Sequence, residues 1–243
     1  SAPSHSALGI DIGGTRVRAA AVTPEGRIVA HREARLPPGG DPQALQTCVG
    51  GLAREVRDEI RTDASAIGVA LPGVWDRRTG IMQRAVNLPR LEGVNLPDLF
   101  LAAFGRAVVL ETDVNAAAWG QWCALTPRSE RLVYLSLGTG VGGAVILDGQ
   151  IVRHTRGGAG HFGFLIVDTA AAPSDASGIP GCLSAIAAGP ALHLAAAGEA
   201  DRNASGDEAL PAPVLERAGA ALGVVLVQLV HIYAPDLILL GGG

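Results

Sequence analysis

Two segments of the chain follow the same pattern, and this internal repeat constrains the fold more than any other feature. Residues 10–29 read IDIGGTRVRAAAVTPEGRIV, and residues 135–152 read LSLGTGVGGAVILDGQIV. Each segment has an apolar strand, a Gly/Thr loop, a strand of small and β-branched residues, a turn with an acidic residue and glycine, and a third strand. The copies lie about 125 residues apart, half of the 243-residue chain. The repeat therefore predicts two α/β lobes of similar design, each a β-meander followed by helices.

The second copy contains the residues 138–143, GTGVGG, which satisfy the G-x-G-x-x-G pattern of dinucleotide-binding folds. In those folds a helix follows the glycines and receives the pyrophosphate. Here AVILDG follows, which predicts a strand that closes in an Asp148-Gly149 hairpin turn. The context argues against an NAD-dependent enzyme. Two plain hairpins with small residues are one interpretation; a pair of loops whose backbone N–H groups bind nucleotide phosphates is the one we favour.

Composition and charge exclude several classes of protein. The net charge is −4 and the 19 basic residues, all arginine, form no cluster, which argues against a nucleic-acid partner. Three widely spaced cysteines indicate a reducing compartment, and the initial SAPSHS lacks the regions of a signal peptide, so a cytoplasmic location is expected. Polar residues and Pro235 interrupt the apolar residues 218–240, which predicts a buried helix, a turn and a buried strand and no membrane span.

Short motifs distributed over nearly the whole chain resemble those of the ROK-family sugar kinases, which belong to the actin/hexokinase/Hsp70-like ATPase superfamily. They occur in the order of that family: GIDIGGT (9–15), GVALPG (68–73), NLP (87–89), ETDVNAAAWGQ (111–121), LSLGTGVGGAVILDG (135–149), GAGH (158–161), GCLS (181–184) and LILLGGG (237–243). The resemblance implies a two-lobed actin-like ATPase (ribonuclease H-like) fold with an interlobe cleft. It also implies ATP-dependent phosphorylation of a hexose or amino-sugar hydroxyl by a homodimer or homotetramer.

The resemblance assigns roles to individual residues. It makes Asp113 the catalytic base and Asp11 the residue that holds Mg²⁺ through water. The expected ATP-binding residues are those of the first phosphate loop, the second phosphate loop and an adenosine motif: Gly13, Gly14 and Thr15; Gly138, Thr139 and Gly140; Gly241, Gly242 and Gly243. The expected sugar-binding positions are Gly73, Asn87, Thr112, Gly158, His161 and Ser184. We therefore expect a first lobe at 1–115, with the first phosphate loop and part of the sugar site, and a second at 116–243.

The chemistry of phosphoryl transfer fits these residue types independently. A carboxylate at the strand-to-helix junction, such as Asp113, suits a general base, although it could instead only cap the helix. Asp11 follows an apolar strand, where a Mg²⁺ shell would offset the cost of an unpaired carboxylate. His161 could be a plain loop residue and Asn87 a plain turn residue.

Four departures from the family pattern affect the sugar and zinc sites. Thr112 stands where the family has Asn, and Gly158 and Ser184 stand where it has Glu, so small groups replace longer polar contacts to sugar hydroxyls. Of the C-x-C-G-x-x-G-C motif, residues 175–182 retain the glycines and Cys182 but lack two of the cysteines, so no zinc is expected.

Two expectations concern the ends of the chain, and two functions stay open. The family usually continues beyond LLGGG with further helices, so the second lobe is expected to be truncated here. Eight residues precede Gly9, too few for the DNA-binding domain of the regulators in this family.

The favoured function is a sugar kinase with ATP, or alternatively polyphosphate, as donor. The alternative is a weakly active or inactive sugar sensor without DNA binding.

Overall fold

The structure is a computed structural model that describes residues 6–61, 64–154, 159–170, 173–199 and 210–242. Its contacts divide the chain into two compact units. The first comprises the residues up to Ala124 together with a short segment from Arg153; the second comprises Leu125–Val152 and the residues from Ala159 onward. The sequence-based division at residue 115 would cut the helix Asp113–Ala124, which the contacts assign as a whole to the first unit.

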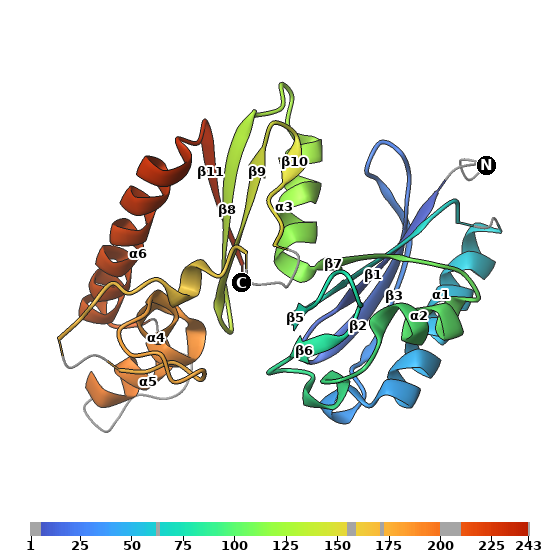
Figure 1. Cartoon of the computed structure of the whole chain (residues 1–243), viewed down its shortest axis with the longest axis horizontal. Coiled ribbons are helices and arrows are strands. Elements are labelled where there is room, and N and C mark those ends of the chain that lie inside the picture. The colour runs from blue at the N-terminus through green and yellow to red at the C-terminus, as the bar shows by residue number, and fades with distance from the viewer. Residues whose placement is uncertain (1–5, 62–63, 155–158, 171–172, 200–209, 243) are drawn as a thin grey trace. The chain divides into compact units, whose positions relative to one another are not determined.

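The first unit is built on a five-stranded sheet with the order β3-β2-β1-β4-β7. β1 and β2 form an antiparallel hairpin, while β4 and β7 extend the sheet parallel to β1. Helices α1 and α2 pack against each other beside this sheet (Figure 1). The elements are β1 (Ala7–Ile12), β2 (Arg16–Val22), β3 (Ile28–Arg35), η1 (Pro38–Gly40), α1 (Pro42–Ile60), β4 (Ile67–Leu71), β5 (Val74–Trp75), β6 (Met82–Arg84), η2 (Pro89–Leu91), α2 (Leu96–Phe104), β7 (Val109–Thr112) and α3 (Asp113–Ala124).

The second unit repeats this topology in a four-stranded sheet with the order β10-β9-β8-β11. The β8–β9 hairpin corresponds to β1–β2, and β11 lies parallel to β8 as β4 does to β1. The predicted repeat of β-meanders is therefore confirmed within each unit. The elements are β8 (Arg131–Leu137), β9 (Val141–Leu147), β10 (Gln150–Ile151), η3 (Phe162–Phe164), α4 (Leu183–Ala187), α5 (Gly189–Glu199), α6 (Ala212–Tyr233) and β11 (Leu237–Gly242).

Alternation along the strands separates an apolar core from a polar face in the first unit. Leu8, Ile10 and Ile12 of β1 are buried, so Gly9 and Asp11 point to the other face of the sheet. The core is mostly aliphatic and extends to α1, whose first turn is capped by Asp41: its carboxylate accepts a hydrogen bond from Ala44 N at 2.9 Å. This alternation is what presents Asp11 outside the core.

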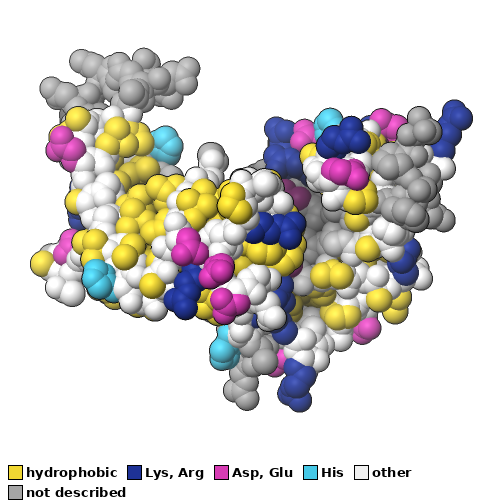
Figure 2. Space-filling model, turned by 90° about the horizontal axis from the view of Figure 1, so that it is seen from above, with side chains coloured by type: hydrophobic (Ala, Val, Ile, Leu, Met, Phe, Trp, Pro, Cys, Tyr) yellow, Lys and Arg dark blue, Asp and Glu magenta, His cyan; other side chains and the backbone are white. Residues whose placement is uncertain are grey.

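The apolar segment 218–240 forms a helix, a turn and a strand as predicted, but the prediction that both elements are buried is wrong. α6 is buried along one stripe only, and every residue of β11 is at least partly exposed. Val214, Ala221, Val225 and Leu229 are buried along one stripe, while other large hydrophobics of the helix are exposed: Leu215, Val224, Val227, Val230 and Ile232. In the view of Figure 2, hydrophobic side chains cover much of the second unit. Among the described helices, α6 alone is long and apolar enough to cross a membrane, which by itself is weak evidence for a span.

Candidate functional site

The β7–α3 junction carries the predicted catalytic carboxylate. The hydroxyl of Thr112 accepts a hydrogen bond from Asn115 N at 3.2 Å, which is the N-cap bond of α3. The alternative that Asp113 only caps this helix is therefore wrong: Asp113 is its first residue, and its Oδ1 accepts a hydrogen bond from the adjacent Val114 N at 2.9 Å. A cap on Thr112 leaves the Asp113 carboxylate available for other chemistry.

The surroundings of Asp113 favour the protonated form of its side chain. Burial raises the pKa of Asp113 above its ordinary value, and the negative charge of Asp11 raises it further, while the hydrogen bond from Val114 N acts in the opposite direction. A carboxylate with a raised pKa has the proton affinity expected of a general base. The same interaction shows that Asp11 and Asp113, which are far apart in sequence, lie close enough to affect each other.

Asp11 lies near the carboxyl end of β1, opposite Arg18 of β2 in the antiparallel register. Arg18 Nη1 and Asp11 Oδ2 are 3.3 Å apart, and both side chains are about half exposed, so the ion pair is weak. An accessible carboxylate of this kind supplies the oxygen donor that a hydrated Mg²⁺ ion requires.

The first phosphate loop lies beside the predicted sugar contact Asn87. Gly13 N donates to Arg16 O at 2.9 Å and closes the loop. A methyl group on Gly14 would lie 3.6 Å from the amide carbon of Asn87, so these two predicted site residues are neighbours. Thr15 is exposed in the same loop, and its carbonyl accepts a hydrogen bond from Leu36 N at 2.9 Å.

Gly73 has a conformational reason to be glycine. Its φ is +126°, and a methyl group there would lie 2.9 Å from Arg84 O. The residue therefore permits the tight turn between β4 and β5 to pack on β6. A direct contact of Gly73 with sugar stays a prediction.

The second phosphate loop has glycines that the surrounding protein does not require. Gly138 N donates to Gly140 O at 3.0 Å, and a methyl group on either glycine would meet no described atom within 4 Å. Thr139 between them is exposed. Gly189 N, at the first residue of α5, donates to Gly138 O at 2.8 Å, so this helix begins against the loop. The sequence had not singled out that helix N-terminus.

Packing explains the glycines of the predicted adenosine motif. A methyl group on Gly241 would overlap the Tyr134 hydroxyl, and one on Gly242, whose φ is +119°, would overlap Leu137 O. The parallel register places Gly242 opposite Leu137, directly before the second phosphate loop. The two predicted nucleotide motifs of the second unit are therefore adjacent. Gly243 lies outside the described residues.

The remaining predicted sugar positions have mixed outcomes. Ser184 is buried in α4, and its hydroxyl accepts a hydrogen bond from Val141 N at 3.3 Å, which ties α4 to the start of β9. His161 precedes η3; its ring stacks on Phe164 with centroids 5.5 Å apart, and burial lowers its pKa, which favours the neutral imidazole. Gly158 lies outside the described residues. Sugar contacts by these residues stay predictions.

The sequence reasoning missed Glu111 as an individual site residue. This carboxylate lies in β7, two residues before Asp113, and pairs with two arginines, Arg77 and Arg153. An acidic residue inside the strand AVVLET was the available signal, because such a charge needs partners when it is buried.

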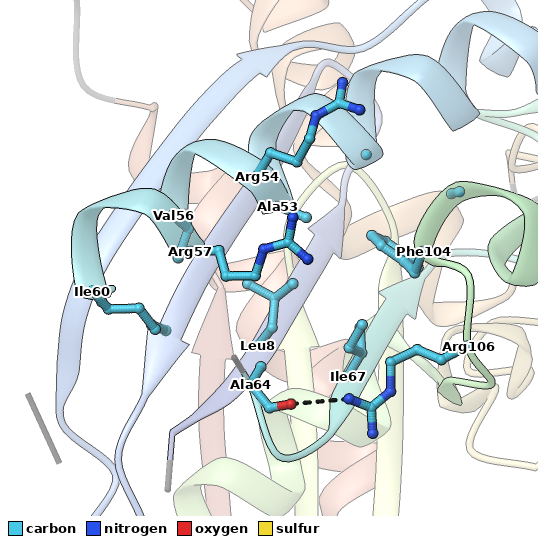
Figure 3. A pocket seen from close by; sticks show the side chains of 13 residues that line it. Leu8, Ala53, Arg54, Val56, Arg57, Ile60, Ala64, Ile67, Phe104 and Arg106 are labelled. Atoms are coloured by element: carbon cyan, nitrogen blue, oxygen red, sulfur yellow. Dashed lines mark hydrogen bonds between the residues drawn. The ribbon is translucent and has the colours of Figure 1, made fainter. Parts of the chain in front are cut away.

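A cavity of about 300 Å³ also lies in the first unit, away from these residues (Figure 3). Its lining includes Leu8 and Ile67, at the amino ends of β1 and β4, and the ends of α1 and α2; Arg106 closes one side by donating to Ala64 O at 3.0 Å. Asp11 and Thr112 lie toward the carboxyl ends of parallel strands, where ligands bind in open α/β sheets. The cavity is therefore not part of the candidate site.

Known proteins are similar to this chain in sequence and in fold. The ROK family matches residues 7–243. The N-acetylmannosamine kinase of Salmonella typhimurium is 32% identical over 78% of this chain and 63% of its own length. The chain thus spans less than two thirds of such curated relatives.

Two solved structures are similar to this chain in fold. The ROK hexokinase of Thermus thermophilus is 30% identical with a TM-score of 0.83, over 98% of this chain and 82% of that one. The ROK glucokinase of Streptomyces griseus, solved with glucose and AMPPNP, is 27% identical with a TM-score of 0.76, over 98% and 83%. These similarities confirm the predicted actin-like ATPase fold class.

Proposed function

This chain belongs to the ROK family, and from that premise we propose that it transfers the terminal phosphoryl group of ATP to a hydroxyl of a hexose or amino sugar. The observation that carries the proposal is the buried carboxylate of Asp113 at the start of α3, close to Asp11, with a raised pKa. The curated relatives named as N-acetylmannosamine kinases and the structures named as hexokinase and glucokinase support the substrate class.

Asp113 is proposed to act as the general base. Its carboxylate accepts the proton of the sugar hydroxyl while that oxygen forms a bond to the terminal phosphorus and the bond from phosphorus to the ADP oxygen breaks. Because burial raises its pKa, the carboxylate holds this proton better than an exposed aspartate would. The products are the sugar phosphate and ADP.

Asp11 is the residue proposed to hold Mg²⁺, through water. The donor set fits: the carboxylate is accessible, lies on the face of β1 opposite the core, and lies close to Asp113. When bound, Mg²⁺ supplies neutralisation of the phosphate charge. The protein's contribution is to keep Asp11 beside the loop Gly13–Thr15.

The two Gly/Thr loops are proposed to bind the phosphates of ATP. The open space around Gly138 and Gly140 supports this role, because neither the backbone nor a neighbouring side chain requires glycine there. The α5 N-terminus beside Gly138 adds the favourable end of a helix dipole. Gly241 and Gly242 are proposed to contact the adenosine of ATP. The register of β8 and β11 places them next to the second loop.

The sugar pocket is proposed to lack three of the longer polar contacts that the family pattern implies, at Thr112, Gly158 and Ser184. The Thr112 hydroxyl caps α3 and the Ser184 hydroxyl bonds to Val141 N, so both are engaged within the protein. Asn87 and His161 are left as the side chains we propose to contact sugar. This loss also supports the second candidate function, a sugar sensor with little turnover.

The direct test is ADP release with Mg-ATP across glucose, mannose, N-acetylglucosamine and N-acetylmannosamine, with polyphosphate as the alternative donor. We expect turnover with at least one sugar. Thermal shift with each sugar and with Mg-ATP runs in parallel, because ligands that bind the folded state raise its apparent stability. A sugar that stabilises the protein and is never phosphorylated would support the sensor.

We also propose that the protein binds no stoichiometric zinc. Cys182 is buried in the core of the second unit, and within the described ranges no three His, Cys, Asp or Glu side chains gather as ligands. Elemental analysis of the purified protein tests this, and one zinc per chain would refute it. The expected homodimer or homotetramer is checked by light scattering, and the expected cytoplasmic location by fractionation of the native host.

A further inference from the structure

Glu111 is a buried carboxylate with four hydrogen-bond donors around it. One oxygen, Oε1, accepts from Thr112 N at 2.9 Å, from Asn115 Nδ2 at 2.8 Å, and from Arg77 Nη2. The other oxygen, Oε2, accepts from Arg153 Nε at 2.6 Å. Only 14% of the side chain is exposed. Such a set of charge-assisted bonds holds a carboxylate in one orientation.

These bonds connect four parts of the first unit. Thr112 and Asn115 flank Asp113 in the chain, so Glu111 binds both sides of the residue that carries the proposed base. Arg77 follows β5, and its guanidinium also lies over the Trp75 ring, 5.3 Å from the centroid. Arg153 follows β10 and is assigned by its contacts to the first unit. Glu111 is thus the centre of a cluster around the β7–α3 junction.

Glu111 and Asp113 are two carboxylates with opposite environments. Burial acts to raise the pKa of Glu111, but the hydrogen bonds from Asn115, Thr112 N and Arg153 and the charge of Arg77 outweigh it, so the pKa is lowered. For Asp113 burial prevails and the pKa is raised. When the environments of two acids drive their pKa values apart, one acid can stay ionised while the other exchanges protons. Glu111 stays ionised and fully hydrogen-bonded, so it is not the proton acceptor.

We propose that Glu111 is a positioning residue: it holds the β7–α3 junction so that the Asp113 carboxylate faces the hydroxyl it deprotonates. This inference rests on the proposed kinase function, because positioning has a catalytic effect only if Asp113 is the base. Small misplacements of a reacting group cost rate far more than they cost substrate binding. Glu111 acts through Asp113 and does not itself touch the substrate.

The kinetic test is Glu111→Gln. Glutamine keeps one acceptor oxygen for Thr112 N and Asn115 but turns an amide N–H₂ toward Arg153 and removes the charge that both arginines need. We expect kcat to fall about 10- to 100-fold, as for partners that orient a catalytic group, with the sugar KM within about 2-fold. Glu59→Gln is the matched control: Glu59 pairs with Arg32 at 2.7 Å on the exposed surface, and its loss should leave kcat unchanged.

The decisive step repeats Glu111→Gln in an Asp113→Asn background. If Glu111 acts only through Asp113, Glu111→Gln should lower kcat by less than about 2-fold in the Asp113→Asn background, because the base is already missing there. An equal loss in both backgrounds, or wild-type kcat for Glu111→Gln alone, would overturn the inference. A merely structural residue would lower stability without this dependence on Asp113.

A readout independent of activity separates this inference from the proposed function. Hydrogen exchange over residues 109–118 should be about tenfold faster in Glu111→Gln than in wild type, because the junction loses its clamp. Exchange in Glu59→Gln should match wild type there. Absence of turnover with every sugar would contradict the kinase proposal. Hydrogen exchange over residues 109–118 that is unchanged in Glu111→Gln would contradict the proposed positioning role of Glu111. If Glu111→Gln does not fold, Arg153→Gln is measured in the same way, and wild-type exchange and kcat in that variant overturn the inference.

Discussion

The hairpin of β1 and β2 and the hairpin of β8 and β9 hold equivalent places in their sheets, yet the residues beside their loops differ in kind. In the first, Asp11 and Arg18 face each other across the strands. In the second, Ser136 and Gly142 face each other across the strands. The first hairpin carries charge, and the second carries none at these positions. A duplicated backbone thus carries an ion pair in one copy and small uncharged residues at the facing positions of the other.

The loops also close differently. Gly13 N bonds to Arg16 O, whereas Gly138 N bonds to Gly140 O, so the closed turn of the first loop is one residue longer. Close packing explains the slim second strand: a methyl group on Gly143 would overlap the Phe162 ring. The second hairpin is therefore constrained by its core on one side and open at its loop.

The largest expected effect is that of Asp113→Asn, which tests whether this residue of the first unit is the proton acceptor. Asp113→Asn should fold and bind sugar and ATP while kcat falls about 10²- to 10⁴-fold, the usual contribution of a general base. Steady-state kinetics with calorimetry of sugar binding measures this. Asp58→Asn, an exposed residue of α1, is the control. Retention of more than a tenth of wild-type kcat would exclude Asp113 as the base.

The same variant has an expected effect on stability. Because the folded-state pKa of Asp113 is raised, its protonated form favours folding below the ordinary pKa of 3.8, and this contribution is lost as pH rises through the folded-state pKa. Asp113→Asn should therefore be slightly more stable than wild type at neutral pH, by up to about 1 kcal/mol. Urea unfolding at pH 7 measures the difference, and a marked loss of stability would contradict it.

The next effect separates the open loop of the second hairpin from its packed strand. Gly138→Ala should raise the KM for ATP about tenfold or more, because a methyl group would enter the space proposed for phosphate, while stability changes by less than about 0.5 kcal/mol. Gly143→Ala should instead lose about 1–3 kcal/mol of stability through overlap with Phe162. Kinetics and urea unfolding distinguish them. Equal KM values for Gly138→Ala and wild type would remove the second loop from the ATP site.

A smaller effect concerns the pH dependence of the first unit. The rate should fall with decreasing pH as Asp113 becomes protonated. This acidic limb of the pH profile should lie at a higher pH than an ordinary aspartate would give, because the pKa of Asp113 is raised. Asp11→Asn removes a neighbouring negative charge, so the limb should move to lower pH even as the maximal rate falls. A pH profile of kcat at saturating Mg-ATP gives both quantities. A limb that moves to higher pH would show that Asp11 does not act on Asp113.

The smallest expected effect tests the charged partner of Asp11. Arg18→Ala frees the carboxylate from a half-exposed ion pair worth about 0.2–1 kcal/mol, so the Mg²⁺ concentration for half-maximal rate should fall about 1.4- to 5-fold. Titration with Mg²⁺ at fixed ATP measures it. A rise in that concentration would instead mean that Arg18 supports binding of the metal nucleotide.

The internal repeat was readable from the sequence because apolar alternation and turn residues act locally. β1, β2 and α1 follow from alternating residues, a Gly/Thr loop and the Asp41 cap. Asp113 could be placed at a strand-to-helix junction for the same reason. Its role stayed open because Thr112 and Asp113 both suit an N-cap, and only the backbone geometry chooses between them.

Other features depend on contacts that no local pattern contains. The exposed apolar side of α6 follows from which stripe of the helix the second unit covers. The bond from Ser184 to Val141 N and the overlap of Gly143 with Phe162 join residues that are distant in sequence. These contacts form only once the sheets are paired.

By itself, the sequence determined two copies of a β-meander, two Gly/Thr loops and the carboxylates Asp11 and Asp113, because strand alternation, turn chemistry and burial of apolar residues act over short distances. The tertiary structure alone decided which acid could be a base. It surrounded Glu111 with Arg77, Arg153 and Asn115, and it left Asp113 buried near Asp11. Proton affinity depends on the charges and donors that folding assembles around a carboxylate, and these come from parts of the chain that no short stretch of sequence contains.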